Sequence, residues 1–113
     1  MSNNGGGGVG YGPGGAVGIA LAARADGRFP VAIIGDGDFT MGPAALWTAA
    51  HYKIPLLVVL HNNTSFGNDE EHQITLAKER ARPTENAWIG QRMAGPTVDY
   101  AAVALVDVRT QLN

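Results

Sequence analysis

The sequence predicts a small α/β protein, in which a parallel sheet flanked by helices forms three layers. Two short apolar runs, at residues 31–34 and 55–60, have the length of strands, and the apolar segment between them has the length of a helix. Strand, helix and strand in this order form a βαβ unit, whose two strands are parallel. We therefore expect residues 1–113 to form one domain of this class.

The composition excludes several kinds of site. The formal net charge is −2, and 45% of the 113 residues are apolar, so we expect one core and no basic surface for nucleic acid or acidic membranes. The chain has no cysteine, which excludes disulfides and thiolate chemistry. No apolar run approaches the ~20 residues that span a bilayer, and the N-terminus lacks the blocks of a signal peptide. We expect a cytoplasmic protein.

The first half of the chain begins with a glycine-rich stretch. Residues 1–15 carry many of the 16 glycines. Such backbone loses much entropy on ordering, so we expect it to be mobile by itself and to order only where a ligand or another chain needs backbone at close range. Residues 16–24 are apolar on nearly every face and predict a short buried helix. Residues 31–34 follow Pro30 and predict a strand that is buried on both faces, as parallel strands usually are.

The second half predicts three further elements and one unusual junction. Residues 43–52 predict a helix with proline in its first turn, and residues 69–82 predict a polar loop that leads into a short exposed helix. Residues 98–104 begin like a helix but run into an apolar run at 105–110 without a turn residue. Because a parallel strand needs a full crossover before it, either 105–110 is a final strand after a missing segment, or this C-terminal segment is not a native strand.

Polar residues follow both predicted strands of the βαβ unit. Asp36 and Asp38, next to Gly35 and Gly37, follow the first strand, and Asn63 follows the second. The carboxyl ends of parallel strands share one edge of a sheet, where α/β proteins bind ligands. Carboxylate and amide oxygens suit Mg²⁺, and an anionic ligand at an edge without Lys or Arg needs such a cation. The pattern predicts a Mg²⁺ site that includes Asp36 and Asn63.

A second motif lies in the glycine-rich stretch. Residues 10–15 match G-x-G-x-x-G, which in dinucleotide-binding proteins follows a strand. Here only glycines and a short polar tail precede it, which favours a glycine-rich turn into a helix. A nucleotide-binding Rossmann-like module remains an alternative interpretation.

The spacing of the strand-end motifs resembles a known signature. Gly35-Asp36-Gly37, then twenty-four residues, then Asn62-Asn63 resembles the signature of thiamine-diphosphate-dependent enzymes. Residues 45–55 are similar to the corresponding helix of benzoylformate decarboxylase and acetolactate-synthase-like proteins. Residues 7–11 resemble the segment beneath the thiazolium ring in that family. The resemblance covers residues 5–92, and 106–110 resemble the family's final strand.

The resemblance implies thiamine diphosphate and Mg²⁺ as cofactors. It implies the diphosphate-binding part of a 2-keto acid decarboxylase or carboligase, in shortened form. Asp36, the Asn63 side chain and the Ser65 carbonyl would bind Mg²⁺, and Val9 would wedge the cofactor into its folded shape. The cofactor-binding residues that it implies are Gly7, Gly8, Val9, Gly35, Gly37, Asp38 and Asn63.

The resemblance also implies a partner. In this family the Glu that activates the cofactor belongs to a separate pyrimidine-binding domain, usually on another subunit, and this chain contains no such domain. We therefore assign no catalytic residue here, and we expect a homo-oligomer or a partner chain that carries that domain. Whether this chain catalyses a reaction by itself stays open. The alternative is a non-catalytic fragment or assembly module that binds a partner through apolar surface without cofactor.

Overall fold

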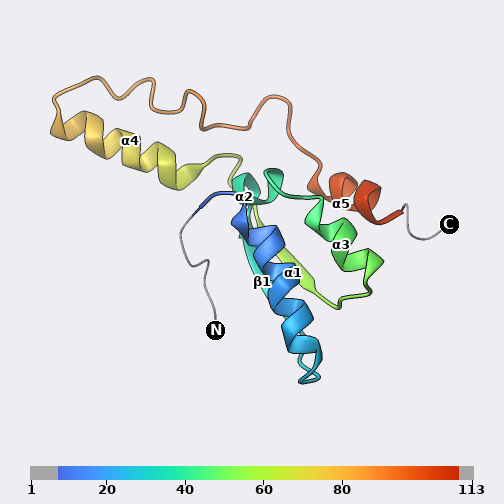
Figure 1. Cartoon of the computed structure of the whole chain (residues 1–113). Coiled ribbons are helices and arrows are strands. Elements are labelled where there is room, and N and C mark those ends of the chain that lie inside the picture. The colour runs from blue at the N-terminus through green and yellow to red at the C-terminus, as the bar shows by residue number, and fades with distance from the viewer. Residues whose placement is uncertain (1–7, 110–113) are drawn as a thin grey trace. The chain divides into compact units, whose positions relative to one another are not determined.

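The structure is a computed structural model that describes residues 8–109 and divides into two compact units (Figure 1). The first unit comprises residues up to 61 together with those from 99 onward, and the second comprises residues 62–98. The elements of the first unit are α1 (Tyr11–Arg24), β1 (Val31–Gly35), α2 (Asp36–Thr40), α3 (Ala45–His51), β2 (Leu57–His61) and α5 (Tyr100–Arg109). The second unit contains α4 (Gly67–Glu79).

The two strands pair in parallel and form the sheet of the first unit. Val31 lies opposite Leu57, and Gly35 lies opposite His61. The short helices α2 and α3 connect the strands, so the predicted βαβ order and the predicted α/β fold are confirmed. Because Gly35 and His61 are partners, both strands end at the same edge of the sheet.

One face of this sheet is exposed. Val31, Ile33, Leu57 and Val59 keep between 45% and 78% of their surface accessible, whereas Ile34, which points to the opposite face, keeps 4%. Paired residues of neighbouring strands share a face, so the four exposed side chains form one apolar surface. The prediction that residues 31–34 are buried on both faces was wrong, because no element in the described part of the chain covers this face.

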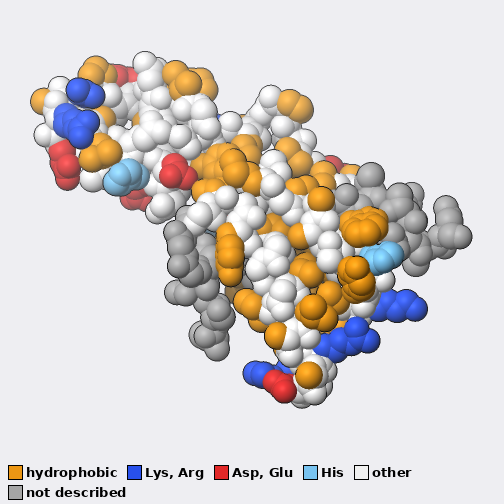
Figure 2. Space-filling model, viewed as in Figure 1, with side chains coloured by type: hydrophobic (Ala, Val, Ile, Leu, Met, Phe, Trp, Pro, Cys, Tyr) orange, Lys and Arg blue, Asp and Glu red, His pale blue; other side chains and the backbone are white. Residues whose placement is uncertain are grey.

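The core of the first unit is small and is built mainly by two helices. Val17 and Ala20 of α1 pack with Ala49 of α3 and with Ile54, which precedes β2. The small side chains of Ala20 and Ala49 let α1 and α3 pack against each other, and the two helices are neighbours in Figure 1. Helix α1 begins at Tyr11, ahead of the predicted residue 16, and only part of its apolar surface is buried. Figure 2 shows hydrophobic side chains on the outer face of these helices.

The C-terminal element is a helix, so the prediction of a final strand was wrong over residues 105–109. Helix α5 runs without interruption from Tyr100 to Arg109, and residue 110 lies outside the described residues. The Asp99 carboxylate accepts a hydrogen bond from the Ala102 N–H at 2.9 Å, which caps the first turn. No Gly or Pro follows to end the helix, and a strand would need a neighbour to pair with.

Helix α4, in the second unit, begins earlier than the sequence predicts. It runs from Gly67 to Glu79 and buries none of its residues. The prediction of an exposed helix is confirmed, whereas the prediction of a loop from residue 69 onward was wrong, because these residues already belong to the helix. Asp69 and Glu70 lie in its first turn and Lys78 in its last, where these charges complement the helix dipole. Figure 2 shows charged side chains around this helix.

A close contact joins the start of α1 to the edge of the sheet. The Gly10 N–H donates a hydrogen bond to the Asp38 carboxylate, and Gly10 has a φ of +92°, which only glycine adopts readily. A Cβ on Gly12 would lie 1.9 Å from Asp38 Oδ2 and 3.3 Å from Ile34 Cγ2. Glycine at position 12 therefore lets α1 lie against Asp38.

This contact predicts opposite effects for two substitutions in α1. We expect Gly12→Ala to lose about 1 kcal/mol or more of folding free energy, because Asp38 must leave its hydrogen bond. Gly14→Ala is the matched control, since its Cβ meets nothing within 4 Å, and we expect it to gain roughly 0.5–1 kcal/mol from helix propensity. Urea unfolding measures both, and an equal gain in the two variants would contradict the contact.

Candidate functional site

The polar edge of the sheet centres on a buried carboxylate. Asp36 follows Gly35 directly, begins α2 and is only 2% exposed. Its Oδ1 accepts a hydrogen bond from the Gly37 N–H at 3.0 Å, whereas its Oδ2 is buried and has no hydrogen-bond partner among residues 8–109. A buried carboxylate oxygen is costly unless a donor or a cation satisfies it. Within the described residues, nothing satisfies this oxygen of Asp36.

The second carboxylate of this edge has a different environment. Asp38 binds the backbone N–H of Gly10, 28 positions earlier in the sequence, and so holds the glycine-rich segment at the sheet edge. Val9 precedes this attachment and is 47% exposed, and Gly8 is exposed as well. Gly7, the other cofactor-binding residue predicted in this segment, lies outside the described residues.

The two glycines that flank Asp36 differ in their surroundings. A Cβ on Gly35 would meet nothing within 4 Å, and Gly37 is buried with its N–H directed to Asp36. The predicted contacts of Gly35, Gly37 and Asp38 with a cofactor stay predictions.

The other predicted metal ligands lie in a tight turn of the second unit. Asn63 Oδ1 accepts the Ser65 N–H at 3.0 Å, and Asn62 Oδ1 accepts the Thr64 N–H at 3.0 Å. A Cβ on Gly67 would lie 2.6 Å from Asn63 Nδ2, so glycine at 67 leaves room for this amide. An amide oxygen has two lone pairs. Asn63 Oδ1 therefore has a second lone pair besides the one that accepts the Ser65 N–H.

A pair of residues that the sequence did not single out supports this turn. Ser65 Oγ donates to Glu70 Oε2 at 2.9 Å, and Arg92 donates to Glu70 Oε1 through Nη2 at 2.9 Å and Nε at 3.2 Å. The Arg92 guanidinium also lies 6.0 Å from the ring centre of Trp88. No motif joins Glu70 to Arg92, which follows 22 positions later, so the sequence carried no signal for the pair.

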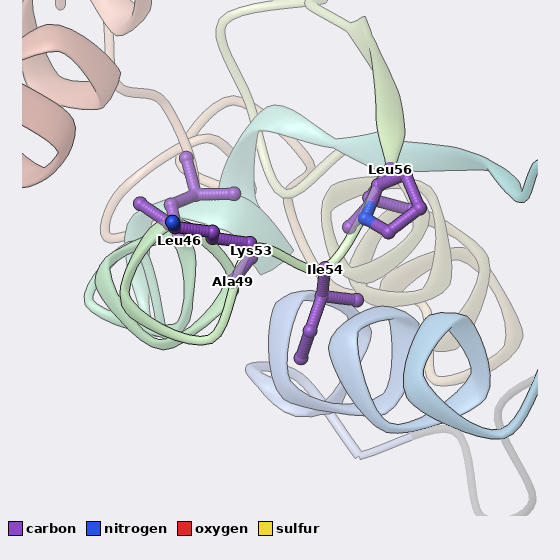
Figure 3. A pocket seen from close by; sticks show the side chains of 7 residues that line it. Leu46, Ala49, Lys53, Ile54 and Leu56 are labelled. Carbon is purple, nitrogen blue, oxygen red and sulfur yellow. The ribbon is translucent and has the colours of Figure 1, made fainter. Parts of the chain in front are cut away.

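The first unit also has a hydrophobic hollow, and Asp36 is not among the residues that line it. Side chains between Leu46 and Leu56 line an open space of about 350 Å³, which Figure 3 shows with Ile54 and Lys53 at its border. It lies before the first residue of β2, whereas the polar edge lies after the last residue. Apart from Lys53 its lining offers no charged group, so it is not the candidate site.

Two broader features follow from the described residues. In residues 8–109 no helix has both the length and the apolar character to cross a membrane. No cluster of three or more His, Asp or Glu side chains suited to a metal occurs in the same residues. The predicted ligand set contains one carboxylate, one amide and one backbone carbonyl, and so is not a cluster of that kind. The cytoplasmic location stays a prediction.

Comparison with known sequences places the chain in a family. Residues 1–106 match the thiamine pyrophosphate enzyme family, at its C-terminal TPP-binding domain. The chain belongs to this family, and the resemblance carried by the Gly-Asp-Gly and Asn-Asn motifs is confirmed. A domain of this class binds thiamine diphosphate, the same compound as thiamine pyrophosphate.

A particular relative is benzoylformate decarboxylase of Pseudomonas aeruginosa. The chain is 41% identical to it over 61 residues, which make up 54% of this chain and 11% of that protein. The chain thus spans about a tenth of the length of this curated relative.

The Glu70 environment predicts a pH dependence of stability. The hydrogen bond from Arg92, and then that from Ser65, lower the pKa of the Glu70 carboxyl below its ordinary value of 4.5. A lowered pKa in the folded state adds stability above the ordinary pKa, and this stability is lost as the pH falls through the folded-state value. We therefore expect Glu70→Gln to reduce the free energy of unfolding at pH 7, and the deficit to shrink below pH 4.5.

Urea unfolding across this pH range measures the deficit. Glu71→Gln, on the next residue of α4, removes the same charge and serves as the control. A deficit for Glu70→Gln that stays constant down to pH 3 would contradict the assigned ion pair.

Proposed function

We propose that this chain binds thiamine diphosphate through Mg²⁺, as the diphosphate-binding part of a 2-keto acid decarboxylase or carboligase. The observation that carries the proposal is the buried Asp36 Oδ2, which has no partner in the described residues. Mg²⁺ is a hard cation that binds one or two carboxylates together with phosphate oxygens, and would satisfy this atom. Membership of the TPP-binding family supports the same ligand.

The donor set fits Mg²⁺ by its chemistry. We assign the metal to Asp36, to the Asn63 side chain and to the backbone carbonyl of Ser65, which are all oxygen donors. One carboxylate leaves half of the cation's charge for the diphosphate, and octahedral coordination leaves positions for phosphate and water oxygens. The free lone pair of Asn63 Oδ1 is compatible with its hydrogen bond from Ser65.

We assign the glycine-rich segment to the organic part of the cofactor. Asp38 fixes Gly10, so Gly8 and Val9 are attached to the sheet edge, and the half-exposed Val9 side chain is accessible to a folded ligand. Thiamine diphosphate, when bound, supplies the electron sink for reactions of 2-keto acids. The activating Glu would come from a pyrimidine-binding domain outside residues 1–113, such as one on a partner chain.

Replacement of Asp36 by its neutral isostere tests the metal site. We expect Asp36→Asn to abolish Mg²⁺-dependent binding of thiamine diphosphate, because it removes the charged metal ligand. Without metal the variant should be at least as stable as the wild type, since the buried unpaired charge is gone. Calorimetric titration with Mg²⁺, and then with excess chelator, measures binding, and urea unfolding measures stability.

The control for this variant is Asp26→Asn. Asp26 is exposed and pairs with Arg28 in the turn after α1. It precedes β1, whereas Asp36 follows that strand, so this variant removes a charge at the other end of the strand. Wild-type affinity in Asp36→Asn, or equal losses in both variants, would refute the assignment.

A second candidate function rests on the exposed face of the sheet. Val31, Ile33, Leu57 and Val59 form an uncovered apolar surface, and such surfaces often mark sites of association. The chain would then act as an assembly module that binds a partner and no cofactor. Sedimentation of the wild-type chain distinguishes the two functions: self-association without Mg²⁺-dependent cofactor binding would favour the module.

A further inference from the structure

We propose that Glu70 is a positioning residue that holds the Asn63–Ser65 turn in the geometry needed for metal binding. The inference rests on the proposed function, because that function assigns the Asn63 side chain and the Ser65 carbonyl to Mg²⁺. One oxygen of the Glu70 carboxylate accepts the Ser65 hydroxyl, and the other accepts two N–H groups of Arg92. A single side chain thus joins the turn to a distant segment.

The turn needs external support because its backbone is strained. Thr64 has a φ of +56°, in the left-handed region that β-branched residues rarely occupy. Within the turn, the Thr64 hydroxyl donates to the Asn63 carbonyl at 2.7 Å. Strained conformations of this kind persist only where surrounding contacts hold them, and they are common at ligand sites.

The contacts that hold the turn come from residues 91–93, which we call the strap. The Phe66 N–H donates to the Gln91 carbonyl at 2.9 Å, and the Met93 N–H donates to the Thr64 carbonyl at 2.8 Å. Ser65 and Arg92 face each other as an antiparallel bridge between these two bonds. The backbone of the strap therefore lies beside the turn on both sides of Ser65.

Glu70 closes this arrangement through side chains. Its side chain is 16% exposed and that of Arg92 is 56% exposed, so the carboxylate is the shielded member of the pair. Because Glu70 belongs to the first turn of α4, it ties three segments together: the turn, the strap and the helix. Mg²⁺ tolerates little departure from octahedral geometry, so loss of this tie should weaken the metal site before it unfolds the chain.

The test measures the Mg²⁺ dependence of cofactor binding in Glu70→Gln. We expect the Mg²⁺ concentration needed for half-maximal binding of thiamine diphosphate to rise about tenfold, as for other residues that orient metal ligands. Saturating Mg²⁺ should restore the wild-type cofactor affinity, which a merely structural loss would not allow. Glu71→Gln, with the same change of charge, should keep the wild-type Mg²⁺ dependence. Equal shifts in both variants, or no shift in Glu70→Gln, would overturn the proposal.

A measurement without ligand separates this inference from the proposed function. Amide hydrogen exchange of the metal-free chain should be about tenfold faster at Ser65 and Met93 in Glu70→Gln than in the wild type, because the turn opens more often. Unchanged exchange would overturn the role of Glu70, whatever the metal data. A wild-type chain that shows no Mg²⁺-dependent binding would instead overturn the proposed function, and with it the metal-related part of this inference.

Discussion

The parallel pairing of β1 with β2 is the constraint on which the candidate site depends. The register sets Gly35 opposite His61, so the two polar segments that follow leave from neighbouring strand ends. A shift of one residue would turn every side chain of the shifted strand to the other face. Ile34 would then leave the core. The burial of Ile34 therefore fixes the register, and with it the position of Asp36 at the end of β1.

The two carboxylates at this edge differ in how far the fold satisfies them. Asp38 is satisfied by the Gly10 N–H, and it anchors α1. Asp36, two residues earlier, is almost fully buried, and one of its oxygens has no partner in the part of the chain that the structure describes. The same residue type therefore stabilises the fold at one position, and at the other retains an unsatisfied group of the kind that binding sites use.

The sequence predicted the elements that local patterns determine. The apolar runs 31–34 and 55–60, and the Gly-Asp-Gly and Asn-Asn motifs, led to the fold and the family, both confirmed. The helical state of residues 105–109 depends on whether a neighbouring strand exists, which local sequence does not specify. The exposure of Ile33 depends in the same way on which elements lie beside the sheet. The contact of Glu70 with Arg92 requires the strap to lie beside the turn, which only the tertiary structure determines.

The uncovered sheet has a consequence for the chain in concentrated solution. Each of the two described strands pairs with one neighbour, so each has an outer row of backbone groups that further strands can join. The stretch Leu57–His61 is rich in β-branched and aliphatic residues and carries no Asp, Glu, Lys or Arg. Segments that form cross-β assemblies have the same kind of composition. An element that covered the exposed face and edges of this sheet would therefore protect the chain from aggregation as well as stabilise its fold. We expect the free chain to aggregate more readily as its concentration rises.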